Sequence, residues 1–114
     1  MSTSEIVAQL CTHFAAATPC DERERESIEQ FLSIAPTLEA PFDEHANDTH
    51  ITGSAIVVGK RGVVLHFHKR LNIWLQPGGH IEPGETPAEG ALREAHLLLA
   101  SHPVRYVRRV ATKY

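Results

Sequence analysis

Residues 78–101 read GGHIEPGETPAEGALREAHLLLAS, and this stretch decides how the chain folds. Glycines on both sides of a short polar segment give the backbone the freedom to approach a ligand closely. Thr86 and Glu89 then form a capping-box pattern with Pro87 at the first helical position, so a helix is predicted to begin here. The stretch predicts a glycine-rich loop and a capped helix, which begins with charged side chains and continues as a row of leucines.

The predicted helix has an apolar face and a polar face. Helical spacing places Ala88, Ala91, Leu92, Ala95 and Leu99 on one side, which we expect to pack on a sheet. The opposite side carries Gly90, Arg93, Glu94 and Leu97, with Leu98 at its margin. Residues 94, 97 and 98 lie over one patch, because helix positions three and four apart are neighbours. Three carboxylates there would suit Mg²⁺, which prefers oxygen ligands, but this chain has only Glu94.

Strand-forming segments precede the loop. Residues 51–58 and 63–68 are rich in β-branched residues and flank the turn sequence GKRG, which predicts a β-hairpin. Residues 72–76 predict a further short strand that ends at Pro77, and residues 78–85 are expected to be loop. After the helix, Val104, Tyr106, Val107 and Val110 allow one more strand.

The N-terminal part predicts two amphipathic helices over residues 5–17 and 19–34 that form a hairpin. Thr18 is the predicted N-cap of the second helix, with Pro19 at its first position. The DERERE run on this helix indicates a solvated face rather than a binding patch, because its charges alternate. Residues 35–50 lack periodicity and predict a surface connection.

Composition limits the class of protein. The 114 residues suit one small domain, and 42% hydrophobic with 22% charged residues is typical of globular proteins. The apolar runs are too short to span a bilayer, so no membrane partner and a cytoplasmic location are expected. Cys11 and Cys20 are expected to be idle thiols. Residues 96–114 carry four basic and no acidic side chains, too short a stretch to predict nucleic-acid binding.

A family motif lies across the loop and the helix. Gly79, Glu85, Arg93, Glu94 and Ala95 match in register the first part of G-x5-E-x7-R-E-U-x-E-E-x-G-U, where U is aliphatic. On these residues the chain resembles the Nudix hydrolases, and within them a subgroup with a GGH loop and an N-terminal helical extension. The resemblance covers residues 1–95. It implies an α+β fold, a Nudix-like α/β/α sandwich that is incomplete at the C-terminus, with residues 1–40 as a helical hairpin extension and 41–114 as a truncated Nudix-like domain.

The match breaks in the second half of the motif. Leu97 and Leu98 stand where the family has its Glu-Glu pair, Ala100 replaces the glycine, and Ser101 replaces the last aliphatic residue. The resemblance implies that the missing glutamates are principal metal ligands and that Arg93 positions Glu94. We therefore hypothesise that residues 96–114 are a non-homologous tail, such as a slip of the reading frame would produce.

The resemblance implies a set of site residues. Catalytic roles fall to Glu85, Arg93 and Glu94, a weakened Mg²⁺ or Mn²⁺ site to Gly79 and Glu94, and substrate contacts to Gly78, Gly79, His80 and Trp74. The implied activity is metal-dependent hydrolysis of a nucleoside diphosphate-linked pyrophosphate, impaired in this chain. The alternatives are a non-catalytic module that binds a phosphorylated ligand or a protein, including a homodimer through Leu97 and Leu98, and a foldable fragment without function.

Simpler interpretations compete at several positions. A zinc site from His66, His68, His80 and His96 is less favoured than half-buried strand histidines. Trp74 fits a core side chain better than a platform for a nucleobase. Among the remaining acids, Glu89 is expected to be used in capping and Glu82 to be solvated.

Overall fold

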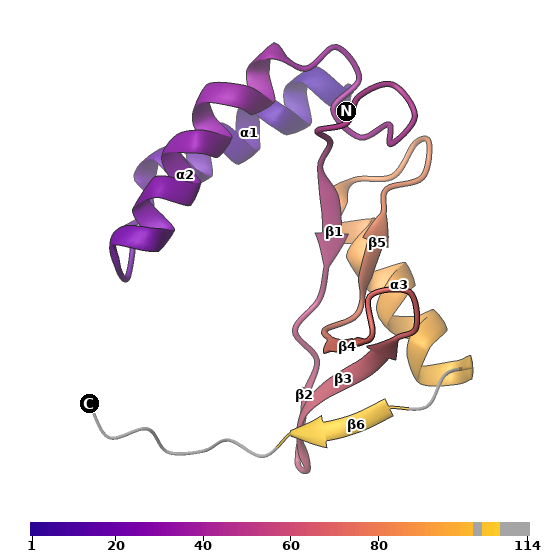
Figure 1. The fold of residues 1–114 in the computed structure, drawn as a ribbon. Helices are drawn as coiled ribbons and strands as arrows, with labels where there is room; N and C mark the ends of the chain where they lie inside the picture. The colour runs from indigo at the N-terminus through magenta and orange to yellow at the C-terminus, as the bar shows by residue number, and fades with distance from the viewer. Residues whose placement is uncertain (102–103, 108–114) are drawn as a thin grey trace. The chain divides into compact units, whose positions relative to one another are not determined.

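The computed structural model describes residues 1–101 and 104–107. The chain divides into two compact units, Met1–Ile51 and Thr52–Tyr114 (Figure 1). The first is helical, and the second contains strands and one long helix, which confirms the predicted α+β class. Among the described helices, none has the length and apolar character that a membrane crossing requires.

The first unit contains the two predicted N-terminal helices. Helix α1 (Thr3–Ala16) begins with a capping box between Ser2 and Glu5. Helix α2 (Glu22–Ile34) begins after Asp21, whose carboxylate accepts a hydrogen bond from the Glu24 amide at 2.7 Å. The prediction of a Thr18 cap was therefore wrong, because Asp21 satisfies the first amides of α2 instead.

Packing within this unit is light. Phe14 of α1 and Phe31 of α2 meet edge to face with ring centroids 5.0 Å apart. Arg25 forms ion pairs with Glu22 and Glu29 on the exposed side of α2, which confirms that the DERERE run is a solvated face. A single 3₁₀ turn, η1 (Ala35–Thr37), follows α2 and leads into the irregular connection.

The second unit contains two small antiparallel sheets. Strand β1 (Thr52–Ser54) pairs with β5 (Gly78–His80), and β2 (Val58–Gly59) forms a short hairpin with β3 (Gly62–His68). The predicted strand over 51–58 is thus interrupted, and Gly78–His80, predicted as loop, is a strand. Gly78–His80 is a strand because β1 supplies its hydrogen-bonding partner. The cross-strand pair Gly53 and Gly79 lacks side chains and leaves room for a helix on top.

Strand β3 is the centre of the larger sheet. Val63 pairs with both Val58 and Val107, and His66 pairs with residues of both β4 (Ile73–Leu75) and β6 (Val104–Val107). Strands β2 and β4 therefore share one edge of β3, and β6 takes the other. The strand predicted after the helix is confirmed over Val104–Val107, while Val110 lies outside the described residues.

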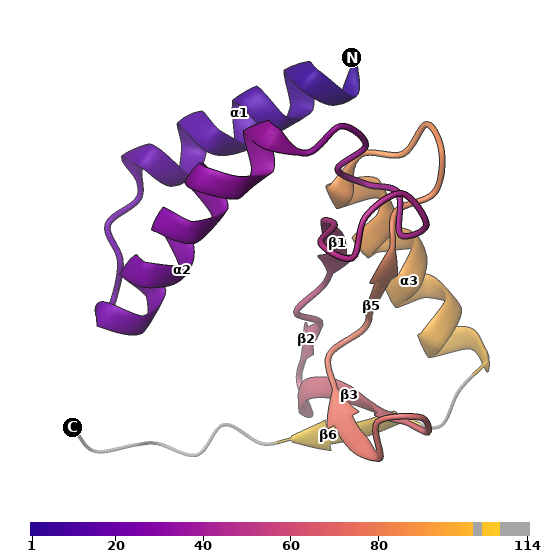
Figure 2. The ribbon, with the colours of Figure 1, turned by 45° about the horizontal axis from the view of Figure 1, so that its top comes forward.

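Helix α3 (Pro87–Ser101) packs on β1 and β5 (Figure 2). Gly90, Ala95 and Leu98 are buried, whereas Ala88, Leu92 and Leu99 are exposed, so the predicted apolar face was wrong for those three. The helix contacts β1 through small groups instead, because a Cβ on Gly53 would lie only 2.6 Å from the Pro87 carbonyl oxygen. With this side of α3 against β1, the Arg93 and Glu94 side chains face the loop before the helix.

Candidate functional site

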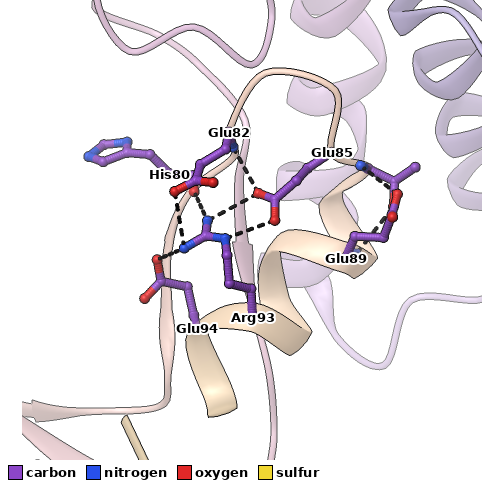
Figure 3. A network of polar contacts seen from close by, with 7 residues as sticks. His80, Glu82, Glu85, Glu89, Arg93 and Glu94 are labelled. Atoms are coloured by element: carbon purple, nitrogen blue, oxygen red, sulfur yellow. Dashed lines mark hydrogen bonds and ion pairs between the residues drawn. The ribbon is translucent and has the colours of Figure 1, made fainter. Parts of the chain in front are cut away.

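A bidentate ion pair joins the start of α3 to the loop before it (Figure 3). Arg93 Nε donates to Glu85 Oε2 at 2.8 Å, and Arg93 Nη2 donates to Glu85 Oε1 at 3.1 Å. Two parallel charge-assisted hydrogen bonds fix both the distance and the orientation of the two groups. Glu85 and Arg93, which the sequence singled out, are therefore in direct contact.

The same guanidinium also reaches the beginning of the loop. Arg93 Nη2 donates to the His80 carbonyl oxygen at 3.0 Å, and Arg93 Nη1 donates to Glu94 Oε1 at 3.0 Å. Glu82 Oε1 lies 3.7 Å from Nη1 and adds a longer ion pair. One arginine thus holds both ends of the loop over residues 80–85 against the helix.

The electrostatics of this cluster favour ionised carboxylates. The hydrogen bonds from Arg93 are the main cause of a lowered Glu85 pKa, and the Glu82 amide, which donates to Glu85 Oε1 at 2.9 Å, lowers it further. The same contacts raise the pKa of Arg93 above its usual value. The guanidinium charge is therefore balanced by the protein's own carboxylates.

The capping box is formed as predicted. Glu89 N donates to Thr86 Oγ1, and Thr86 N donates to Glu89 Oε1, both at 3.1 Å. Glu89 is consequently engaged in capping, which confirms its expected role.

Glu94 lies directly against the glycine strand. A Cβ on Gly79 would be only 2.7 Å from Glu94 Oε1, so the carboxylate occupies the space that a side chain would need. Gly78 serves β-sheet packing, because its Cβ would be 2.8 Å from the Ser54 Cβ. His80 contributes its carbonyl to the network, while its imidazole points away (Figure 3). The structure therefore brings Gly79, His80, Arg93 and Glu94 together.

The two leucines after this network have different environments. Leu98 is only 7% exposed and belongs to the core, whereas Leu97 is 51% exposed. The predicted apolar surface patch of both leucines is therefore wrong for Leu98. Neither side chain offers an oxygen to a ligand.

A known protein family matches the segment that contains this network. Residues 48–96 match the NUDIX domain. This segment, which contains the loop and the first half of α3, is therefore similar to the Nudix family. The match ends one residue before Leu97, where the charged half of α3 gives way to the leucines. The Nudix hydrolase lineage implies small phosphorylated substrates, and its members generally use divalent metal ions.

The residues of this chain do not fit such a metal ion. Glu94 Oε1 already accepts a hydrogen bond from Arg93, and the Leu97 and Leu98 positions supply no donor. Across residues 1–101 and 104–107, no group of three His, Cys, Asp or Glu side chains is placed to hold a metal. Mg²⁺ prefers carboxylate oxygens in near-octahedral geometry, and the carboxylates of Glu82, Glu85 and Glu94 are directed to the Arg93 guanidinium instead.

Trp74 lies on the larger sheet and takes no part in the network of hydrogen bonds and ion pairs around Arg93. It pairs with Phe67 across β3 and β4 and is 37% exposed, so the interpretation of Trp74 as a core side chain was wrong. His66 and His68 share a face, with ring centroids 6.2 Å apart. His68 Nδ1 accepts a hydrogen bond from the Leu71 amide at 3.2 Å and so stabilises the turn.

Sequence reasoning missed Gly53 and the role of Glu82. Gly53 is the point of closest approach between β1 and α3, and its only signal was a glycine inside a β-branched run. The Glu82 side chain is exposed, as expected, but its amide donates to Glu85 and its carboxylate lies 3.7 Å from Arg93 Nη1. Its position in the middle of the loop gave no sign of this.

Proposed function

We propose that this chain derives from Nudix hydrolases that cleave a nucleoside diphosphate-linked pyrophosphate, and that its own hydrolysis is impaired. The observation that carries the proposal is the contrast within α3. Arg93, Glu85 and Glu94 form a complete network, whereas the next two family positions hold a buried and an exposed leucine.

The impairment follows from the charge that the reaction needs. Phosphoryl transfer depends on positive charge placed where negative charge develops in the transition state. At this site the cation is Arg93, and its donors are already directed to Glu85, Glu94 and the His80 carbonyl. The scaffold that would position a ligand is therefore kept, while the charge that would accelerate the reaction is not available.

The remaining family residues define where a ligand would bind. Gly78, Gly79 and His80 form β5, next to the Glu94 carboxylate, and we assign them to ligand contact. Any Mg²⁺ or Mn²⁺ would bind weakly at Gly79 and Glu94. Trp74 belongs to the other sheet and is the least supported of the predicted substrate contacts.

Hydrolysis assays test this proposal. The chain would be incubated with ADP-ribose, nucleoside triphosphates and dinucleoside polyphosphates, in MgCl₂ or MnCl₂, beside a Leu97→Glu, Leu98→Glu variant. A Leu92→Glu, Leu99→Glu variant adds the same charge at exposed positions of α3 outside the family pair. We expect no hydrolysis by the unmodified chain or by this control. The Leu97→Glu, Leu98→Glu variant should gain metal-dependent hydrolysis.

Folding must be checked in the same experiment. Leu98 is buried, so a glutamate there costs stability unless a metal binds it, and far-UV circular dichroism with and without MnCl₂ reports this. The exposed Leu97→Glu change alone is a second variant that retains the fold. Metal-dependent turnover by the unmodified chain, lost on adding EDTA, would show that its activity is intact and would refute the impairment.

A second candidate function is a non-catalytic binding module. Leu97 favours it, because an exposed leucine on α3 offers an apolar contact to a protein, including a second copy of this chain. Sedimentation at micromolar concentration would show a dimer that Leu97→Glu abolishes and Leu99→Glu leaves intact. A monomer at all concentrations would argue against the homodimer.

A further inference from the structure

The larger sheet has an exposed pair of aromatic side chains that takes no part in the network around Arg93. Phe67 and Trp74 are direct cross-strand partners on β3 and β4, with ring centroids 5.5 Å apart and planes inclined by 59°. Phe67 is 39% exposed and Trp74 37%. Each ring therefore keeps part of its surface in contact with solvent, although burying aromatic surface is favourable.

The apolar face continues along β3. Val63 and Leu65 alternate with Phe67 and so lie on the same side of the strand, where both are partly exposed. Val58, the register partner of Val63, is strongly exposed. Strand β3 lies between β6 on one side and β2 and β4 on the other. The face is thus a strip along one strand rather than a single spot.

Positive charge lies at both ends of this strip. Lys60 and Arg61 form the turn between β2 and β3, and Lys69 and Arg70 lie in the turn between β3 and β4. Residues 52–81 contain no Asp or Glu, although the chain as a whole has a net charge of -3. This sheet is therefore complementary to an anion.

The length of the strip favours a polymer over a single nucleotide. Strand β3 has 7 residues and is about 23 Å long, so its two basic turns lie too far apart for one nucleotide to contact both. A single strand places phosphates along its whole length and bases that can stack on aromatic rings between them.

We propose that this face of the larger sheet binds single-stranded nucleic acid, with bases stacked on Phe67 and Trp74 and phosphates near the two basic turns. Aromatic side chains on a sheet with basic surroundings are a common way to bind unpaired bases. The basic residues of 96–114 alone did not predict nucleic-acid binding, whereas this proposal rests on the turns at the two ends of β3. The binding uses no metal and no residue of the Arg93 network, so it is independent of the proposed hydrolysis.

Trp74 is the only tryptophan of the chain and reports directly on its own surface. The full chain would be titrated with an oligothymidylate of about 12 nucleotides and with the matching oligouridylate, in EDTA at low salt. We expect saturable quenching of Trp74 fluorescence. The logarithm of the affinity should fall linearly with the logarithm of the salt concentration, by about 0.7 for each phosphate contacted.

Two variants and two controls separate stacking from charge. Phe67→Ala should weaken binding about ten-fold, because one stacking surface is lost. Lys69→Gln with Arg70→Gln should weaken binding and reduce the salt dependence. Leu92→Ala removes an exposed leucine on α3, and Arg23→Gln removes an exposed cation on α2, and both should bind as the unmodified chain does.

Several results would overturn the proposal. These are an absence of quenching at low salt, equal affinity for a blunt duplex, unchanged affinity of Phe67→Ala, and thymidine monophosphate binding as tightly as the oligomer. A fifth is a concentration-dependent change in Trp74 fluorescence without nucleic acid that Phe67→Ala removes, because it would show that a second copy of the chain covers this face.

Discussion

The two halves of helix α3 differ in what holds them in place. The first half, residues 87–94, is fixed by polar contacts, namely the Thr86 and Glu89 capping box and the five acceptor oxygens around the Arg93 guanidinium. The second half, residues 95–101, is held by burial of Ala95 and Leu98. Contacts within the protein therefore organise the loop and the start of α3. Their geometry does not depend on the carboxylates that this chain lacks.

The largest expected effect separates the two leucines of the second half. Leu98→Ala should destabilise the fold by about 2–4 kcal/mol, because it leaves a cavity between α3 and its neighbours. Leu97→Ala, one position earlier and exposed, should change stability by less than about 0.5 kcal/mol. Thermal unfolding followed by circular dichroism compares them. Equal effects of the two changes would show that α3 does not pack as described.

The next effect concerns the first half. Arg93→Met keeps the length of the side chain but removes all its hydrogen bonds, so we expect the melting temperature to fall by about 5–10 °C. Arg23→Met on the exposed side of α2 is the matched control and should have little effect. If Arg93→Met melts like the unmodified chain, the network does not hold the loop.

Helix approach to the sheet is tested at Gly53. Gly53→Ala should cost about 1–3 kcal/mol, because the new Cβ meets the backbone oxygen of Pro87, which cannot move by itself. Gly59→Ala is the control, since a Cβ there meets nothing within 4 Å. Urea unfolding compares the stability of the two variants. Equal unfolding midpoints would contradict the close contact of β1 and α3.

Removing the cap should have a smaller effect. Thr86→Ala leaves the Glu89 amide without its acceptor and should reduce stability by about 1 kcal/mol. Thr86→Ser keeps a hydroxyl and should restore most of the loss. A serine variant as unstable as the alanine variant would mean that the hydroxyl hydrogen bond is not the cause.

The smallest effect is a change of stability with pH. The folded-state pKa of Glu85 is lowered, so its contribution is present above the unfolded pKa of about 4.3 and is lost as the pH falls through the folded value. The melting temperatures of the chain and of Glu85→Gln should therefore differ at pH 7 and begin to converge as the pH falls below about 4. Glu26→Gln on α2 serves as the control. A difference that stays constant down to pH of about 3 would exclude the ion pair as its source.

Local signals in the sequence predicted much of this structure. The capping box, the helical hairpin, the strand before Pro77 and the approach of Glu85, Arg93 and Glu94 all follow from short-range chemistry or from the family motif. These features depend on residues close to one another in the sequence or on a fixed motif spacing.

The errors arose where distant segments meet. The face of α3 that packs was mispredicted because Gly53, far away in the sequence, allows its small residues to approach β1. Gly78–His80 became a strand because β1 supplies the partner, which no local pattern in the loop could show. The exposure of Trp74 depends on which elements pack on each face of the larger sheet. Its hydrophobicity alone favoured a position in the core.

Metal binding is the measurement that tests the central claim most directly. Free Mn²⁺ would be followed by electron paramagnetic resonance during titration of the chain and of the Leu97→Glu, Leu98→Glu variant, with Leu92→Glu, Leu99→Glu as the charge-matched control. The account predicts weak binding by the chain and by the control, and binding at least about ten-fold tighter by the first variant. Tight binding of Mn²⁺ by the unmodified chain, lost in Glu94→Gln, would contradict it.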